Sequence, residues 1–127
     1  MNEMTEKMRD IAVAALEDVK AKNILALDTT QLSDQFECMI VATGDSNRQV
    51  RALANNVREE LKTKGYEIIG TEGEEYGEWV LVDAGDLIVH VMQPPVRDYY
   101  DIEQLWGGQK PVFNPIGKPW SAVDSAE

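Results

Sequence analysis

Apolar positions in the first part of the chain change from a helical period to continuous runs. Residues 4–22 carry apolar side chains at three- and four-residue steps, so one stripe of a helix is apolar. Residues 24–27 form a short apolar run typical of a strand, and residues 28–30 have the composition of a turn. Residues 36–43 are nearly continuous in apolar character, which predicts a central strand covered on both faces.

A second helical period follows a turn that begins at Gly44. Ser46 and Gln49 have the spacing of a capping box, in which a hydroxyl and an amide bind backbone N–H groups at a helix start. Apolar residues then recur at helical steps, and Gly65 stands where a helix commonly ends. The pattern therefore predicts a strongly amphipathic helix between these signals.

The second half of the chain is dominated by patterns typical of strands. Residues 66–69 predict a third strand, which a polar, glycine-rich loop at 70–77 follows. Residues 79–82 and 87–92 are rich in β-branched and apolar residues, and a short connection with Gly and Asp joins them. Two such runs with a short turn predict a β-hairpin.

One more helical pattern and a polar segment complete the chain. The Pro-Pro pair at 94–95 is expected to break the chain, and residues 96–106 have the spacing of a last helix. Gly and Pro then recur, so residues 107–127 are predicted to form an extended tail. We expect that tail to be ordered only where Phe113 or Trp120 finds a pocket.

The predicted order of elements is α-β-β-α-β-β-β-α. Because each amphipathic helix must cover an apolar sheet face, this order predicts one α/β (α+β) domain with a mixed five-stranded sheet and flanking helices. A chain of 127 residues is long enough for one such domain and too short for two. We assign residues 1–106 to the domain and residues 107–127 to the tail.

The charge balance restricts the partners that the chain can bind. Twelve Lys and Arg against 23 Asp and Glu give a net charge of −11, and the sequence pI is about 4.4. Affinity for nucleic acid comes largely from Lys and Arg at the phosphates, so we expect no DNA binding and little direct RNA contact. A basic protein surface is the favoured partner, because opposite fields speed encounter.

Features of secreted and membrane proteins are not expected. Cys38 is the single cysteine, so no internal disulfide can form, and a thiol in an apolar run usually behaves as a small hydrophobe. The first residues lack the basic and apolar regions of a secretory signal. No apolar run approaches the roughly 20 residues that cross a bilayer. We expect a cytoplasmic protein that does not contact a membrane.

The turn from Thr43 to Ser46 is the feature that most resembles part of an enzyme. A strand, a glycine turn and a helix start can together bind phosphate, as in nucleotidyltransferases. Those enzymes also need two metal-binding carboxylates one residue apart on a strand, whereas Asp83 and Asp86 are separated by two residues across a hairpin turn. We therefore favour a helix cap at Ser46 and expect no catalysis, with a nucleotidyltransferase-type enzyme as the alternative.

Metal and cofactor sites are not expected either. One His and one Cys cannot supply the ligands of a structural zinc site, and His90 lies inside an apolar strand, where a structural histidine is typical. The acidic stretch 72–78 lacks the spacing of an EF-hand, which favours a solvated charge run. No nucleophile has a nearby base in sequence.

The candidate residues for partner binding surround the predicted hairpin and the last helix. Trp79, Leu81 and Asp83 alternate onto one strand face, and the sequence leaves Leu81 open between core and interface. Trp79 follows an acidic loop, and a tryptophan at a sheet rim is a good interface anchor. Arg97 and Tyr100 are expected at the interface, whereas core burial is favoured for Tyr99.

Three stretches together resemble the ribosomal silencing factors, the Iojap-like family. They are Thr-Gly-x-Ser-x-Arg-Gln-Val at 43–50, Trp-Val-x-x-Asp-x-Gly-Asp-x-x-Val-His at 79–90 and Arg-x-Tyr-Tyr-x-Ile-Glu-x-Leu-Trp at 97–106. The resemblance covers the chain from the first helix to Trp106. It places Asp86, with Trp79, Leu81 and Asp83, in the family's long middle motif.

The resemblance implies a function and a fold. Members of this family bind the large ribosomal subunit at its fourteenth protein and sterically block joining with the small subunit, which represses translation. Their fold is related to that of nucleotidyltransferases but lacks their activity, and homodimers are common in solution. The resemblance thus implies a translational silencer without cofactors. A large-subunit assembly factor that uses the same docking surface is a further alternative.

Overall fold

A computed structural model describes residues 1–100, 102 and 111–113 of the chain. Helix α1 spans Glu3–Asp18, and the side chain of Asn2 caps it by accepting the N–H of Thr5. The helix ends before the expected residue 22, because the backbone leaves the helical conformation at Lys20, whose φ angle is 68°. The N–H of Ala21 donates to the carbonyl of Leu16 at 3.0 Å and closes this end.

Helix α2 spans Asn47–Thr63 and begins as predicted. The hydroxyl of Ser46 accepts the N–H of Gln49, and Gly65 follows the helix with a φ of +92°. Helix α3 spans Pro94–Tyr100, so the Pro-Pro pair forms its first turn and does not precede it. Proline suits this position because the first helical N–H groups have no partner within the helix. The rest of the predicted last helix, except residue 102, lies outside the described residues.

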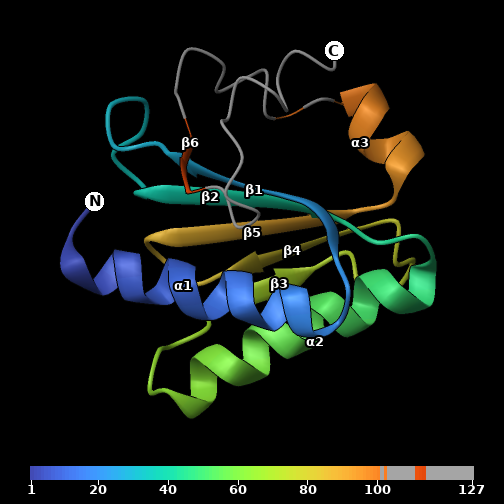
Figure 1. The fold of residues 1–127 in the computed structure, drawn as a ribbon, viewed down its shortest axis with the longest axis horizontal. Helices are drawn as coiled ribbons and strands as arrows, with labels where there is room; N and C mark the ends of the chain where they lie inside the picture. Colours follow the sequence, from blue (N-terminus) through green and yellow to red (C-terminus); the bar gives the residue numbers. More distant parts are fainter. Residues whose placement is uncertain (101, 103–110, 114–127) are drawn as a thin grey trace.

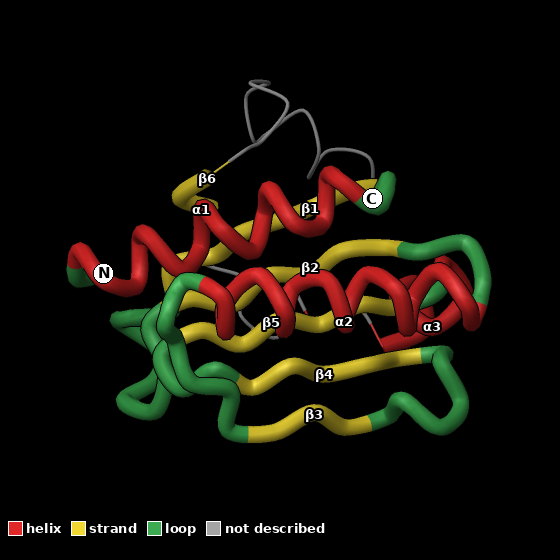
Figure 2. The backbone as a smooth tube through the Cα atoms, turned by 90° about the horizontal axis from the view of Figure 1, so that it is seen from below, coloured by secondary structure: helices red, strands yellow, loops and turns green. Residues whose placement is uncertain are grey.

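The strands form one mixed sheet in the order β3-β4-β5-β2-β1-β6 (Figure 2). Their bounds are β1 Lys22–Asp28, β2 Cys38–Thr43, β3 Gly70–Glu72, β4 Trp79–Asp83, β5 Leu87–Met92 and β6 Pro111–Phe113. Strands β2 and β5 pair in parallel, and the other neighbouring strands pair antiparallel. The predicted mixed α/β architecture is therefore confirmed, with β2 and β5 at its centre.

Two details of the strands differ from the prediction. The third strand is Gly70–Glu72, not residues 66–69. It lies in the segment that was expected to be a loop, and it pairs with β4. A sixth short strand, β6, adds to the edge of the sheet beside β1. It comes from the predicted tail, of which residues 107–110 and 114–127 lie outside the described part of the chain.

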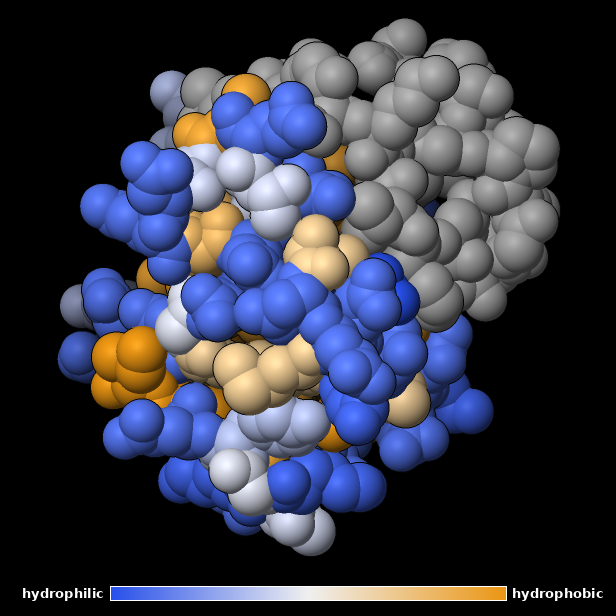
Figure 3. All heavy atoms as spheres, turned by 90° about the vertical axis from the view of Figure 1, so that its left-hand side faces the viewer, coloured by the Kyte–Doolittle hydropathy of each residue, from blue (hydrophilic) through white to orange (hydrophobic). Residues whose placement is uncertain are grey.

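The surface is predominantly hydrophilic on the side that Figure 3 shows, and apolar residues form small separate areas there. None of the helices in the described part of the chain combines the length and the apolar character that crossing a membrane requires.

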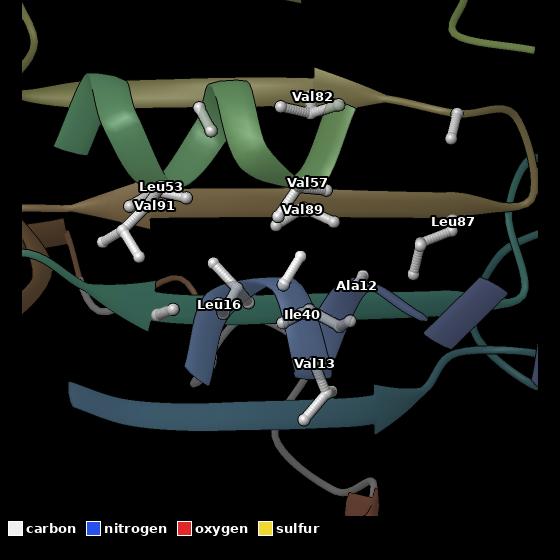
Figure 4. Packing of buried hydrophobic residues seen from close by; sticks show 14 of the residues in the cluster. Ala12, Val13, Leu16, Ile40, Leu53, Val57, Val82, Leu87, Val89 and Val91 are labelled. Carbon is white, nitrogen blue, oxygen red and sulfur yellow. The ribbon is translucent and has the colours of Figure 1, made fainter. Parts of the chain in front are cut away.

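The main core lies between the sheet and helices α1 and α2, which cover the same face (Figure 1). Leu53 and Val57 of α2 pack over Val89 and Val91 of β5, and Leu16 of α1 packs near Ile40 (Figure 4). Side chains of a strand alternate between faces, so β2, β4 and β5 each supply every second residue to this core.

A smaller apolar cluster lies on the opposite face of the sheet. Its buried members are Leu25, Leu27, Met39, Val41, Met92 and Ile102, with Phe36, Trp79 and Val96 packed beside them. Helix α3 lies on this side of the sheet (Figure 1). Helix α3 therefore covers part of the face that α1 and α2 leave open, and Trp79 is half-buried on that face.

Candidate docking surface

The loop at residues 73–78 leads the chain into β4 and sets the position of Trp79. Gly73 has a φ of +88°, and a Cβ atom there would lie 2.0 Å from the carbonyl oxygen of Trp79. The guanidinium of Arg51, on α2, donates to the backbone carbonyls of Glu74 and Glu75 at 2.7 and 2.8 Å. The acidic loop is thus held against α2 by hydrogen bonds from the Arg51 side chain to the loop backbone.

An ion pair also holds this loop, so its carboxylates do not all point freely into solvent as the sequence suggested. Arg58 Nη1 lies 3.0 Å from Glu74 Oε2 and 3.2 Å from the hydroxyl of Thr71 on β3. Gly77 has a φ of +72°, and its Cβ position is 2.9 Å from the carbonyl oxygen of Asn47. Both ends of the loop therefore require glycine for conformation and for space.

The alternation predicted for β4 is present in the structure. Val80 and Val82 are buried beneath the helices, whereas Trp79, Leu81 and Asp83 lie on the opposite face and are half-buried. In the antiparallel pairing with β5, Leu81 stands opposite His90 and Trp79 stands opposite Met92. Leu81, which the sequence left open, is thus neither fully buried nor fully exposed.

Trp79, His90, Tyr99 and Tyr100 form an aromatic cluster between β4, β5 and α3. The ring centroid of Trp79 lies 5.0 Å from that of Tyr100 and 5.8 Å from that of His90. Tyr99 meets Tyr100 edge to face, with centroids 5.0 Å apart. Tyr99 is 82% exposed and Tyr100 53% exposed, so the expected core burial of Tyr99 is wrong.

His90 is the polar residue at the base of this cluster. Its Nδ1 accepts the indole N–H of Trp79 at 3.0 Å. Burial lowers the pKa of His90 to about 4, since the charged imidazolium would lose its hydration. At neutral pH the ring is therefore uncharged with its proton on Nε2, and the predicted structural role of this histidine is confirmed.

Arg97 was expected at the interface, but its side chain is buried and only 9% exposed. Its Nη1 donates to the carbonyl of Asn23 at 2.6 Å and to the hydroxyl of Thr43 at 2.9 Å. The short helix α3 places this guanidinium toward the sheet and the two tyrosines outward. Arg97 thus connects α3 to the ends of β1 and β2, and the expectation that it is not a core residue is wrong.

Asp83 and Asp86 lie at the other end of the hairpin. Asp83 Oδ1 accepts the N–H of Gly85 at 2.9 Å, which stabilises the turn. The backbone carbonyl of Asp86 accepts the N–H groups of Glu37 and Cys38 at 2.8 and 3.0 Å. The five residues of β4 separate Asp83 from Trp79 by roughly 13 Å. The candidate residues therefore form two groups, with Leu81 between them.

The turn at 43–46 acts as a helix cap, as predicted. Ser46 Oγ accepts the N–H of Gln49 at 3.1 Å, and Gln49 Oε1 accepts the N–H of Asp45 at 2.7 Å. Asp45 forms an ion pair with Lys22, at 2.7 Å between Nζ and Oδ2. The Ser46 hydroxyl and the Asp45 N–H are thus engaged within the protein, and the carboxylate of Asp45 adds a negative charge beside the helix start.

Reactive and metal-binding groups are few in the described part of the chain. Cys38 is buried, and burial raises the pKa of its thiol to about 12, so it behaves as the small hydrophobe predicted. No cluster of three or more His, Cys, Asp or Glu side chains that could hold a metal ion occurs among the described residues.

Sequence reasoning found Trp79, Leu81 and Tyr100 but did not connect them with His90 and Tyr99. The signal for His90 was available, since its alternation in β5 places it on the same face as Ile88 and Met92. For Tyr99 the sequence favoured the core and the structure shows exposure, because the pattern in a helix of seven residues does not reveal which side meets the sheet.

A small α/β domain with exposed aromatic side chains beside an acidic loop is typical of a protein that binds another macromolecule. The family model described as "Ribosomal silencing factor during starvation" (RsfS) matches residues 2–126. The chain belongs to this family of ribosomal silencing factors.

Individual relatives show the same likeness. The chain is 63% identical over 120 residues to the ribosomal silencing factor RsfS of Chromobacterium violaceum, which covers 93% of this chain and 98% of that protein. A crystal structure of a protein from the same organism superposes with a TM-score of 0.80 at 62% identity, and covers 91% of this chain and 97% of that one. A mouse protein named "Mitochondrial assembly of ribosomal large subunit protein 1" is 25% identical over 100 residues, 76% of this chain and 44% of that protein.

Proposed function

We propose that this protein is a translational silencer that binds the large ribosomal subunit and sterically blocks joining with the small subunit. Membership of the silencing factor family supports this function. The observation that carries the docking site is the aromatic cluster, in which Trp79 is half-buried and Tyr100 is exposed beside an acidic loop. Large aromatic side chains that are partly fixed before binding are typical anchors of protein interfaces.

The partner that we infer on the subunit is a basic protein, and the family resemblance implies the fourteenth protein of the large subunit. Trp79, Leu81 and Tyr100 would supply the apolar contacts, and Asp83 and Asp86 would meet basic groups at the other end of the hairpin. Arg97 would act indirectly, by holding α3. We also infer a cytoplasmic protein that is a homodimer when free, binds no DNA and makes little direct RNA contact.

Sedimentation of cell extracts through a sucrose gradient tests this function. We expect the protein in fractions of the free large subunit and its absence from joined ribosomes and polysomes. In a purified system, added protein should reduce the amount of joined ribosomes that forms from separate subunits. Equal occupancy of joined ribosomes and free large subunits would contradict silencing.

A large-subunit assembly factor is the second candidate, because a mouse relative is named for assembly of the mitochondrial large subunit. Depletion of the protein distinguishes the two. Immature large-subunit particles would accumulate if assembly is the role, whereas a silencer would leave mature subunits that join more readily. Metal-dependent nucleotide transfer by the purified protein would instead support the enzymatic alternative.

A further inference from the structure

The indole of Trp79 is fixed by a contact on the sheet itself. His90 lies in β5 opposite Leu81, diagonal to Trp79 in β4, and its Nδ1 accepts the indole N–H at 3.0 Å. The two rings are tilted by 51°, with centroids 5.8 Å apart. The indole also meets Tyr100, whose centroid lies 5.0 Å away at a tilt of 48°. The ring is thus held between a strand and α3.

This arrangement decides which part of Trp79 a partner can use. An indole has one N–H donor and no acceptor. Since His90 already accepts that donor, a partner that needed the same N–H would have to break an internal hydrogen bond in a half-buried site. A partner would therefore meet carbon atoms of this half-buried ring.

We propose that His90 is a positioning residue for docking, which holds the Trp79 indole against Tyr100 and directs its carbon surface, rather than its N–H, toward the partner. This inference rests on the proposed docking function of the cluster. It adds a residue that does not itself contact the partner. The arrangement requires an uncharged His90 with a free lone pair on Nδ1, which agrees with its lowered pKa.

Two variants of His90 distinguish the effect of its hydrogen-bond acceptor from the effect of its ring volume. His90→Asn keeps an acceptor near the position of Nδ1, whereas His90→Phe keeps an aromatic ring without an acceptor. We expect His90→Phe to weaken binding to purified large subunits about tenfold, the effect of one lost hydrogen bond. His90→Asn should remain within about threefold of the wild-type affinity.

A double-mutant cycle tests whether His90 acts through Trp79. Trp79→Phe removes the indole donor, so adding His90→Phe to it should not reduce affinity further. In ¹⁵N NMR spectra, the indole N–H of Trp79, identified by its loss in Trp79→Phe, should exchange slowly with water in the wild type. It should shift and exchange faster in His90→Phe but not in His90→Asn.

Each contrary outcome has a distinct meaning. If the wild-type protein does not bind large subunits, the proposed function fails before any variant is compared. If it binds and His90→Phe binds equally well, or loses the same affinity in the Trp79→Phe background, the positioning role is overturned alone. If His90→Phe does not fold, His90→Leu takes its place in the same cycle and in the same spectra.

Discussion

At the scale of single residues, Trp79 has contacts within the protein and, in the proposed function, a role in docking. Its N–H and one side of its ring contact His90 and Tyr100, which restricts its orientation. It is half-buried, whereas Tyr76 in the preceding loop is 69% exposed and lies outside the aromatic cluster. A side chain that is ordered before binding loses less entropy when the partner arrives. Trp79 is therefore the residue whose truncation tests the docking surface most directly.

Trp79→Ala should weaken binding to the large subunit by at least about 2 kcal/mol, roughly thirtyfold, as expected for a hot-spot residue. Because the indole is half-buried and hydrogen-bonded, we also expect the free energy of unfolding to fall by about 1–3 kcal/mol. Affinity and thermal melting should be measured on the same sample, at a temperature where the variant is folded. Tyr76→Ala is the control, and it should change neither quantity. A folded Trp79→Ala protein with wild-type affinity would remove Trp79 from the docking surface.

His90 should make stability depend on pH. Burial lowers its pKa to about 4, while the unfolded chain has a value near 6.5. Between these values the unfolded state binds more protons than the folded state, so stability falls as the pH decreases from about 6.5 to about 4. The His90 contribution is constant above and below this window and is on the order of 3 kcal/mol.

Urea unfolding at several pH values measures this effect. The free energy of unfolding should fall more steeply with decreasing pH in the wild type than in His90→Asn, which cannot titrate. The carboxylates are the same in both proteins and cancel in the comparison. Parallel curves over this pH range would show that His90 does not couple folding to protonation.

At the scale of elements, the loop at 73–78 matters because it determines where β4 begins. Its two glycines have positive φ angles, and Arg51 binds its backbone from α2. Helix α3 is the matching element on the other side of Trp79, and Arg97 connects it to β1 and β2 through Asn23 and Thr43. The proposed docking surface thus depends on two short segments, the loop held by Arg51 and Arg58 and the helix held by Arg97.

Two glycine substitutions distinguish the cost of a positive φ angle from the cost of a steric clash at the added Cβ atom. Gly65 and Gly73 have similar φ angles of +92° and +88°, but a Cβ at Gly65 meets nothing within 4 Å, while one at Gly73 lies 2.0 Å from the Trp79 carbonyl oxygen. Gly65→Ala should cost about 1 kcal/mol of stability, the penalty of the left-handed conformation. Gly73→Ala should cost at least about 3 kcal/mol, because the backbone at Trp79 must also move.

Chemical denaturation of both variants measures the difference. We expect Gly73→Ala to weaken docking as well, through the displaced indole, whereas Gly65→Ala should bind normally. Equal loss of stability in the two variants would mean that the close approach of Gly73 to Trp79 is relieved at no cost.

At the scale of the whole molecule, the net charge of −11 is the dominant property. It comes from 23 acidic against 12 basic residues along the whole chain, so long-range attraction to a basic partner does not depend on one contact. Such attraction acts before the two proteins touch and mainly changes the rate of encounter.

Salt should therefore slow association more than it accelerates dissociation. Between low and physiological ionic strength we expect the association rate constant with the large subunit to fall by at least about threefold, because the charges are screened. Stopped-flow mixing at several salt concentrations measures it. Trp79→Ala, which removes no charge, should show the same salt dependence of association as the wild type. An unchanged association rate would mean that the negative charge contributes to solubility and not to association with the partner.

The sequence by itself determined the features that depend on neighbouring residues. The amphipathic stripes of α1 and α2, the cap at Ser46, the glycine after α2 and the hairpin of β4 and β5 follow from local periodicity and backbone chemistry. The alternation in β4 also placed Trp79 and Leu81 on the same face before any fold was known. The family resemblance came from the same local motifs.

Only the tertiary structure decided the features that need a distant partner. Residues 70–72 form a strand because β4 lies beside them, although residues 66–69 have the stronger strand pattern. Arg97 is buried and Tyr99 exposed because the side of α3 that meets the sheet depends on β1 and β2, more than 50 residues away in the chain. His90 contacts Trp79 because the hairpin register brings their strands together. A local pattern specifies which side chains share a face, whereas pairing and packing between segments decide what that face meets.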